Sequence, residues 1–277
     1  MKNNLYKKKI TLSEIVKTEK ILREMNLHSV CEESRCPNIS ECFKKNVVTF
    51  LILGDICTRN CQFCSVKKGI PLPVDEEEPL RVAKAVEILG MEYVVITSVT
   101  RDDLPDSGAG VFKATVEEIK KTSCMSKIEV LIPDFNGDEK AILTVLDTFP
   151  DVISHNIETV ERLYPVLRDR ADYKRSLGVL KKIKKLNPEQ KIKSGIMIGL
   201  GETEDEIMET MKDISSTGCD FFSIGQYLAP QKAGFTVQRY YKPEEFEYYK
   251  EKAKEAGFRY VESGIYVRTS YNATAYF

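Results

Sequence analysis

Apolar and polar positions along most of this chain follow two alternating periodicities. Short runs of consecutive apolar residues, typical of strands buried on both faces, alternate with segments in which apolar residues recur every three or four positions, typical of amphipathic helices. The predicted strands cover residues 47–53, 93–99, 128–132, 152–157, 192–200 and 221–228. The predicted helices cover residues 79–89, 112–119, 139–146, 159–167, 173–186, 204–214 and 246–253.

The helix predicted after residue 203 has the clearest start signal. Thr203 is followed three positions later by Glu206, the spacing of a capping box in which each side chain satisfies a free backbone N–H of the other. Ile207, Met211 and Ile214 then fall on one helical face. We therefore expect a helix that begins directly after Thr203.

The repeated strand and helix units predict a parallel sheet with right-handed crossovers. Six units rather than eight favour an α/β fold with a partial (β/α)6 TIM-like barrel, and an open doubly wound sheet is the alternative. The barrel is predicted over residues 46–257. Residues 1–45 are expected to form an N-terminal extension, and residues 258–277 a C-terminal segment.

Composition narrows the class of protein. The 277 residues are 42% hydrophobic and 30% charged, as in an ordinary globular chain. With 41 basic and 42 acidic residues, broad electrostatic binding to nucleic acid or anionic membranes is not expected. The lysine-rich start lacks an apolar signal segment, and no uncharged apolar run reaches the roughly 18 residues of a membrane span. We expect a cytoplasmic protein.

Six of the eight cysteines form two triplets, with spacings C-x4-C-x5-C and C-x3-C-x2-C. Three thiolates on a short loop can hold three irons of a [4Fe–4S] cluster and leave the fourth iron for another ligand. A disulfide framework is typical of smaller secreted chains, and zinc sites usually pair two Cys-x-x-Cys units or add histidines, of which only His28 and His155 exist. We predict two [4Fe–4S] clusters, at Cys31, Cys36 and Cys42 and at Cys57, Cys61 and Cys64.

The second triplet directly follows the first predicted strand, with Phe63 before its last cysteine. Such a loop lies at the carboxyl edge of a parallel barrel, where these folds place their chemistry. This arrangement resembles the motif of the radical S-adenosylmethionine (SAM) superfamily. The resemblance implies a barrel of the radical SAM type, in which the open iron binds SAM. It also implies reductive cleavage of SAM to a 5′-deoxyadenosyl radical that abstracts hydrogen from an unactivated carbon.

The first triplet resembles the auxiliary-cluster motif of the lipoyl synthase family. Similarity to that family extends along nearly the whole chain from about residue 20. It includes residues 54–59, 97–104, 155–160, 199–203, 224–228 and 268–273.

The segment beginning at Arg268 resembles the family's R-S-S-Y motif, in which a serine oxygen is the fourth ligand of the auxiliary cluster. Ser270 keeps its place before Tyr271, whereas Thr269 replaces the first serine. The resemblance implies that Ser270 is the ligand, but Thr269 also carries a hydroxyl and remains an alternative. Oxygen binds iron as a harder and more labile ligand than thiolate.

The resemblance implies insertion of two sulfur atoms at C6 and C8 of a protein-bound octanoyl-lysine. Two SAM would be consumed, and the auxiliary cluster would donate the sulfur. Implied partners are an octanoylated carrier (the glycine-cleavage H protein or a dehydrogenase E2 lipoyl domain), a ferredoxin- or flavodoxin-type reductant, and a carrier that rebuilds the cluster. No nucleic acid or membrane partner is expected, and a monomer is the default.

Thr97, Ser98, Asn156 and Glu158 lie near the ends of predicted strands. By analogy with radical SAM barrels, residues at such positions contact the methionine amino group and the ribose of SAM. Hydrogen bonding within strand ends and turns is the alternative role.

Several residues have less specific interpretations. Cys124 and Cys219 fit neither triplet and are expected to be small buried apolar residues. His155 is expected to be a hydrogen-bonded structural residue. The sequence also contains a basic run. It is expected to be a solvated helix face or, alternatively, a docking surface for an acidic carrier. The run comprises Lys181, Lys182, Lys184 and Lys185, with Lys191 and Lys193 nearby.

The sequence departs from the family pattern at several positions, and two other functions are compatible with the cysteine motifs. Val111, Ser40 and Phe43 replace a histidine, a glycine and a tryptophan that are common in the family, and the usual tail after residue 273 is expected to be missing. One rival is another two-cluster radical SAM enzyme, such as a methylthiotransferase. The other is an electron-transfer protein, although its clusters would normally have four cysteines each.

Overall fold

The computed structural model describes residues 11–230 and 234–276. The first ten residues of the predicted N-terminal extension, and Phe277 of the predicted C-terminal segment, lie outside this range. Within the described ranges, no helix is long and apolar enough to cross a membrane.

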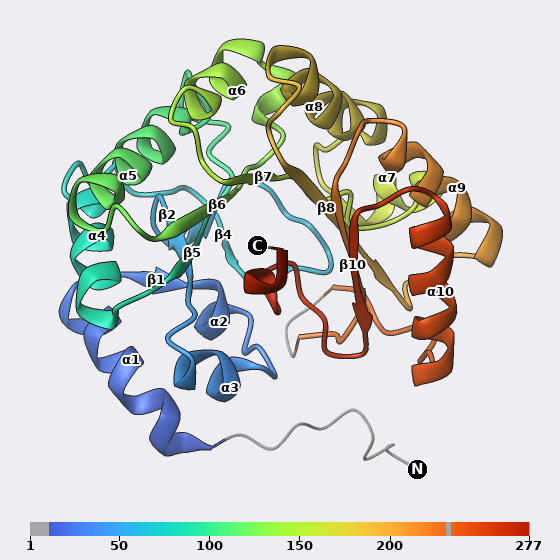
Figure 1. Ribbon diagram of the computed structural model, residues 1–277, viewed down its shortest axis with the longest axis horizontal. Coiled ribbons are helices and arrows are strands. Elements are labelled where there is room, and N and C mark those ends of the chain that lie inside the picture. Colours follow the sequence, from blue (N-terminus) through green and yellow to red (C-terminus); the bar gives the residue numbers. More distant parts are fainter. Residues whose placement is uncertain (1–10, 231–233, 277) are drawn as a thin grey trace.

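A curved sheet surrounds the centre of the molecule, and helices cover its outer face (Figure 1). Its eight strands, counted over the described residues, have the order β1-β2-β5-β6-β7-β8-β9-β10. All neighbours are parallel except β1 and β2. The strands are β1 (His28–Ser29), β2 (Thr49–Ile52), β5 (Tyr93–Ser98), β6 (Lys127–Leu131), β7 (Val152–Ser154), β8 (Ile192–Ile198), β9 (Phe221–Gln226) and β10 (Tyr260–Gly264).

Three helices precede β2, and the others follow the strands of the barrel. The first three are α1 (Leu12–Glu24), α2 (Val30–Glu33) and α3 (Ile39–Lys44). The others are α4 (Glu78–Leu89), α5 (Ala109–Thr122), α6 (Glu139–Leu146), α7 (Tyr164–Leu167), α8 (Tyr173–Leu186), α9 (Glu204–Ser215) and α10 (Pro243–Glu255). A small parallel ladder joins β3 (Ile56–Cys57) to β4 (Lys67–Lys68), and short 3-10 turns cover Phe135–Gly137, Glu161–Leu163 and Ala273–Tyr276.

The predicted partial barrel is confirmed, because the six expected strands are present as β2 and β5 to β9 with a helix after each. The capping box at α9 is also present, with Glu206 accepting from the Thr203 N–H at 2.8 Å. The helix predicted over residues 159–167 is wrong in length. Pro165 lacks an N–H and its ring would clash with the preceding turn, so an α-helix begins only at Tyr164.

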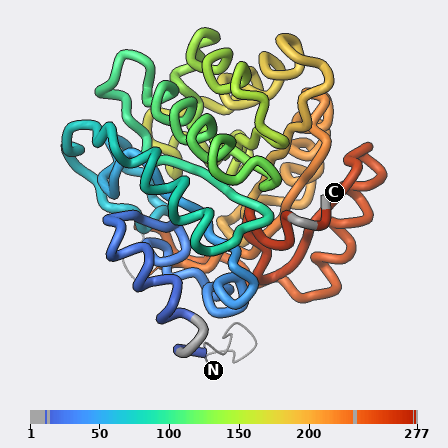
Figure 2. Tube along the Cα trace, turned by 60° about the vertical axis from the view of Figure 1, so that its left-hand side comes forward, coloured from blue at the N-terminus to red at the C-terminus, as the bar shows by residue number. Residues whose placement is uncertain are grey.

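Both chain extensions join the sheet, which the sequence pattern did not predict. β1 pairs with β2 at one edge, and β10 pairs with β9 at the other. The segment after β10 then returns to the N-terminal helices, where the Asn38 side chain donates to the Tyr266 carbonyl at 2.7 Å. In Figure 2 the dark red segment that follows β10 lies beside the blue segment that precedes β2. The open side of the barrel is therefore occupied by residues from both ends of the chain.

A cluster of buried polar side chains joins strands β5, β6, β7 and β8. Lys193 on β8 and Glu129 on β6 are both fully buried, and the Lys193 Nζ lies 3.1 Å from each Glu129 carboxylate oxygen. Tyr93 and Ser154 donate to the same carboxylate at 2.7 and 2.5 Å. Burial lowers the pKa of Lys193, whereas Glu129 counteracts this effect. Each charge is thus tolerated only because its partner is present.

Removing one charge of this pair should cost much more stability than removing both. Glu129→Gln leaves Lys193 buried without a counter-charge, so we expect the free energy of unfolding to fall by about 3–5 kcal/mol. Glu129→Leu combined with Lys193→Met should recover most of that loss. Glu118→Gln, which breaks the exposed pair with Lys121, is the control and should change stability by less than about 1 kcal/mol. The free energy of unfolding is measured by urea denaturation followed by circular dichroism, because the chain has no Trp to report unfolding by fluorescence. Equal stability of Glu129→Gln and wild type would contradict the prediction.

Candidate metal centre and active-site cavity

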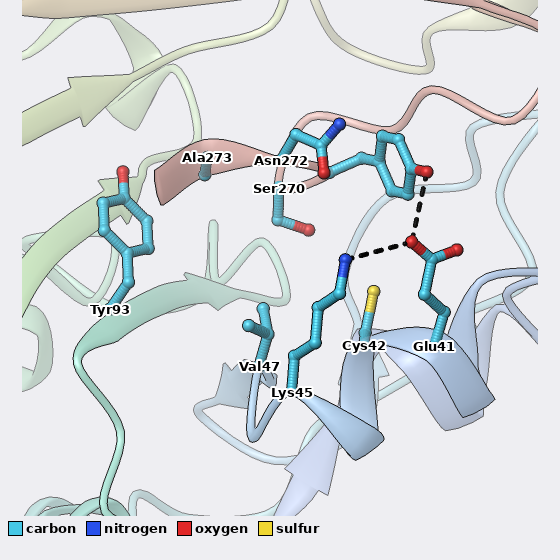
Figure 3. Close-up of a pocket in the computed structure, with 9 residues that line it drawn as sticks. Glu41, Cys42, Lys45, Val47, Tyr93, Ser270, Asn272 and Ala273 are labelled. Carbon is cyan, nitrogen blue, oxygen red and sulfur yellow. Dashed lines mark hydrogen bonds and ion pairs between the residues drawn. The ribbon is translucent and has the colours of Figure 1, made fainter. Parts of the chain in front are cut away.

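A cavity of about 310 Å³ lies at the carboxyl edge of the parallel strands. Its lining brings together both cysteine triplets, the predicted SAM contacts and the C-terminal segment. These residues include Cys31, Cys36, Cys57, Cys61, Cys64, Thr97, Ser98, Asn156, Glu158, Thr269 and Ser270. Cys42 faces a second cavity of about 50 Å³, which shares Ser270 with the first (Figure 3). All of these cysteines are free thiols.

The second triplet lies on a loop that β2 delivers to the cavity. Leu53 and Gly54 both have positive φ angles, 68° and 82°, and turn the chain out of the strand. The buried Glu78 carboxylate stabilises this turn by accepting from the Leu53 N–H at 2.7 Å. Further along, the Thr58 N–H bonds to the Thr100 carbonyl at 3.0 Å, and the Gln62 N–H bonds to the Leu167 carbonyl at 2.9 Å. The loop is therefore held by segments that follow β5 and β7.

Arg59 is the main anchor of this loop, although the sequence analysis assigned it no role. Its side chain is 4% exposed and bonds both oxygens of Asp102 at 2.8 Å and both oxygens of Asp134 at 2.8 and 3.0 Å. Burial alone would raise the pKa of Asp134, but the bonds and charge of Arg59 hold it well below its usual range. The Arg59 backbone N–H lies 3.4 Å from the Cys57 sulfur. The ion network therefore fixes the chain directly beside a candidate ligand.

The first triplet lies on two short helices and the turn between them. Ser29 caps α2, which contains Cys31, by accepting from the Glu32 N–H at 3.2 Å. The left-handed backbone of Arg35, with φ 48°, then brings the Cys36 N–H to 3.0 Å from the Cys31 carbonyl. Burial, with a smaller contribution from Cys36, raises the pKa of Cys31 to about 12. This thiol keeps its proton until a metal ion replaces it.

The C-terminal segment reaches the first triplet by crossing β9 at a glycine. A side-chain carbon on Gly225 would lie 2.3 Å from the Val267 carbonyl oxygen, so only glycine permits this approach. Beyond the crossing, Ser270 accepts from the Thr49 hydroxyl at 2.9 Å. The Tyr271 hydroxyl donates to the Glu41 carboxylate at 3.4 Å. Residues from both ends of the chain therefore surround the same small cavity.

The predicted SAM contacts all line the large cavity. Ser98 Oγ and Asn156 Oδ1 are buried and have no hydrogen-bond partner among the described residues. Thr97 instead donates to the Leu131 carbonyl at 2.9 Å. Glu158 has a left-handed φ of 70°, and burial raises the pKa of its carboxyl. Unpaired buried polar atoms and backbone strain are both typical of sites that hold a ligand.

The donor set fits two iron–sulfur clusters and a polar organic cofactor. Each triplet supplies three free thiols. Burial is the main cause of the raised pKa of Cys31 and of Cys64, and the neighbouring Cys36 and Cys61 add to it. Three thiols on one short segment are the ligand set that iron–sulfur clusters use. The cavity between the triplets offers the unsatisfied hydroxyl and amide groups that a small polar molecule would need.

Other sequence-based interpretations have mixed outcomes. His155 is buried and its Nδ1 lies 2.9 Å from the Ile132 carbonyl, which confirms the expected hydrogen bond. Cys219 is buried as expected, but Cys124 is exposed because it lies in the turn after α5, so that prediction was wrong. Lys193 is not part of a surface run, since it lies in the barrel. Lys184 forms an ion pair with Asp220 at 2.9 Å, which leaves less of the basic run for docking.

The family model described as "Radical SAM superfamily" matches residues 51–214. Curated relatives named lipoyl synthase include the protein of Caldicellulosiruptor saccharolyticus, 56% identical over 92% of this chain and 89% of its own length. Another, from Caldanaerobacter subterraneus subsp. tengcongensis, is 52% identical over 96% of this chain and 94% of its own. A third, from Geotalea daltonii, is 50% identical over 97% and 91%.

Solved structures support the fold alone, because their sequences are distant. Methylornithine synthase superposes with a TM-score of 0.60 at 14% identity, covering 92% of this chain and 86% of that one. Streptococcus suis SuiB bound to S-adenosylmethionine gives a TM-score of 0.61 at 14% identity, covering 94% and 63%.

Arg59→Gln should disorganise the second triplet. The substitution leaves the carboxylates of Asp102 and Asp134 without their main counter-charge, so we expect about 3–5 kcal/mol less stability and loss of roughly half the bound iron. Arg101→Gln is the matched control, because its partner Asp103 is 39% exposed and the iron should be retained. Iron analysis after anaerobic reconstitution, together with urea unfolding, makes the comparison. Full iron content in Arg59→Gln would rule out the anchoring role.

Gly225→Ala should displace the C-terminal segment and empty the first triplet selectively. The added methyl would overlap the Val267 carbonyl, so Ser270 could no longer lie beside Cys42, and about half of the iron should be lost. Gly178→Ala, on α8 with open space around it, is the control. Iron content and circular dichroism together separate local displacement from unfolding. A folded Gly225→Ala protein with normal iron would be the contrary result.

Proposed function

Because the chain belongs to the lipoyl synthase family of radical SAM enzymes, we propose how its residues divide the work of that reaction. The enzyme is a radical SAM sulfurtransferase that uses two [4Fe–4S] clusters and SAM. It inserts two sulfur atoms at C6 and C8 of an octanoyl-lysine on a carrier protein, gives lipoyl-lysine, and consumes two SAM. The methylthiotransferase and electron-carrier alternatives are disfavoured by these relatives.

In this proposal the two triplets have different tasks. Cys57, Cys61 and Cys64 would hold the cluster that binds SAM, and Cys31, Cys36 and Cys42 with Ser270 would hold the auxiliary cluster. When bound, the first cluster with SAM supplies the 5′-deoxyadenosyl radical, and the auxiliary cluster supplies the sulfur. The protein itself binds the substrate, orients it and excludes water.

The single observation that supports this function is that cysteines of both triplets line one cavity. A substrate carbon in that cavity lies within reach of both sites without leaving the protein. Leu51, Val95 and Leu131 supply apolar lining on three neighbouring strands. An aliphatic chain can be buried against them at a gain of about 0.8 kcal/mol per methylene. Exclusion of water also protects a carbon radical from side reactions.

We assign SAM orientation to Thr97, Ser98, Asn156 and Glu158. Ser98 and Asn156 have buried polar atoms that are unsatisfied among the described residues, so a polar ligand would complete their hydrogen bonding. Glu158 provides acceptor oxygens at the same wall of the cavity, and the Asn156 amide orients it through a bond of 3.0 Å. These groups would position SAM before cleavage rather than transfer protons.

The substrate is an octanoylated carrier protein. We also propose the identity of that carrier, of the reductant and of the protein that rebuilds the cluster. The carrier would be a glycine-cleavage H protein or a dehydrogenase E2 lipoyl domain, and the reductant a ferredoxin or flavodoxin. A separate iron–sulfur carrier would rebuild the auxiliary cluster. We further propose a cytoplasmic monomer in which residues 1–45 and 258–277 complete the barrel of residues 46–257.

The test of function is anaerobic turnover of an octanoyl-lysine peptide. Protein reconstituted with iron and sulfide receives SAM and dithionite, and mass spectrometry follows the peptide. Gain of two sulfurs, at no more than one product per protein, is expected if the auxiliary cluster is consumed. Formation of 5′-deoxyadenosine with an unchanged peptide would contradict the substrate assignment. No SAM cleavage at all would contradict the enzyme mechanism.

Ser98→Ala and Asn156→Ala should weaken SAM binding by roughly tenfold each. Ser98→Ala removes one hydrogen-bonding group that is left unpaired for a ligand, worth about 1–1.5 kcal/mol. Asn156→Ala removes such a group and also the amide that donates to Glu158 and Thr269. Ser176→Ala, a fully buried serine on α8 outside the cavity lining, is the control and should bind SAM normally. Equilibrium binding of SAM to the reconstituted protein gives the comparison. Unaltered affinity in both cavity variants would remove these residues from the SAM site.

A further inference from the structure

Two adjacent hydroxyls, those of Thr269 and Ser270, lie at the junction of the two cluster sites. Each forms a different hydrogen bond. The Thr49 hydroxyl donates to Ser270 Oγ at 2.9 Å, and the Asn156 amide donates to Thr269 Oγ1 at 2.8 Å. The two donors come from β2 and from the residue that follows His155 after β7. The neighbouring hydroxyls are thus tied to different walls of the barrel.

We propose that Thr49 is a positioning residue for the fourth ligand of the auxiliary cluster. We also propose that the hydrogen bond from Asn156 holds Thr269 at the SAM site, away from the auxiliary cluster. The inference rests on the proposed function, because it takes Ser270 as the auxiliary ligand. It adds a residue that directs Ser270 toward the first triplet and a separate role for Thr269.

Thr49 contacts two candidate ligands of the auxiliary cluster, Ser270 and Cys31. Its hydroxyl donates to Ser270 at 2.9 Å, and its backbone also forms a hydrogen bond with the Cys31 thiol. Ser270 and Thr49 are 221 positions apart in sequence, so this one residue of β2 joins ligands from the two chain extensions. A position that contacts two candidate ligands of one cluster is well placed to fix their relative geometry.

The side chain of Thr49 is suited to this task. Thr49 is the first residue of β2 and is 5% exposed, so its backbone is fixed by the sheet and its hydroxyl is shielded from water. A β-branched side chain in a strand has few χ1 rotamers, which makes the hydroxyl a rigid donor. A serine oxygen that accepts one hydrogen bond retains a second lone pair for a metal ion. The bond therefore orients Ser270 without using its capacity as a ligand.

Thr269 is held on the other side of the junction. The Asn156 amide that donates to it also donates to Glu158 at 3.0 Å, so Thr269 joins the group of residues assigned to SAM. In contrast, Ser270 is the one of the two that also lines the small cavity with Cys42. Figure 3 shows the Ser270 side chain above Cys42 and Lys45. The hydrogen bonds thereby distinguish two residues that the sequence motif alone could not separate.

The first test measures the auxiliary cluster in isolation from the other one. Full-length protein with Cys57, Cys61 and Cys64 changed to alanine retains only the first triplet and is reconstituted anaerobically. In this background Thr49→Val, which keeps the shape but removes the hydroxyl, should release iron to a chelator about fivefold faster. Its Mössbauer spectrum should show altered parameters for the iron that Ser270 binds. Thr49→Ser should restore both readouts.

Three further variants complete the design. Thr115→Val, a buried threonine whose hydroxyl bonds its own helix, should release iron at the parental rate. Ser270→Ala should release iron at least as fast as Thr49→Val. Thr269→Val should leave iron release unchanged but weaken SAM binding about fivefold in protein with both triplets intact.

Two results would overturn the inference. One is an unchanged iron release rate and spectrum in Thr49→Val. The other is a change of the auxiliary spectrum in Thr269→Val but not in Ser270→Ala, which would make Thr269 the ligand. Failure of the proposed function is distinguishable, because it would show as no cluster at the first triplet in the parental protein or as no sulfur insertion by the wild type.

Discussion

The site depends on the opening between the two edge strands of the sheet. β1 and β10 lie at opposite ends of the strand order, so the parallel sheet stops short of a closed barrel in the described chain. The C-terminal segment enters this opening after crossing β9 at Gly225, where the Val267 carbonyl occupies the space of a side chain. It meets α3 through Asn38 and β2 through Thr49.

Balanced buried charges make the walls of this site rigid. Arg59 and Arg175 face Asp102 and Asp134 at the cavity edge, and Lys193 faces Glu129 deeper in the barrel. Such networks contribute little net stability compared with apolar packing, but each charge strongly disfavours any arrangement that separates it from its partner. The second triplet is consequently held in place by its surroundings, and cluster binding does not have to order the loop from a disordered state.

The features that the sequence predicted are those with a local or periodic signal. The parallel units follow from apolar periodicity, and the start of α9 follows from the Thr203 capping box. β1 and β10 were missed because strands of two and five residues at an edge carry little pattern. Lys193 was grouped with surface lysines because its partner Glu129 is 64 positions away. The sequence likewise indicates only that Thr49 favours a strand, because its partner Ser270 is 221 positions away.

The two triplets also differ in how firmly the fold holds them, and the difference agrees with their proposed tasks. The loop of the second triplet is bound by Thr100, Leu167 and the buried Arg59 network, so it is preorganised for a cluster that is used repeatedly. The first triplet lies on helices of four and six residues, joined to the C-terminal segment by a few side-chain hydrogen bonds. Short helices of this kind have little stability of their own. A cluster that gives up its sulfur must be dismantled and replaced in each cycle. Ligands held by separable contacts can accommodate that replacement without unfolding the barrel.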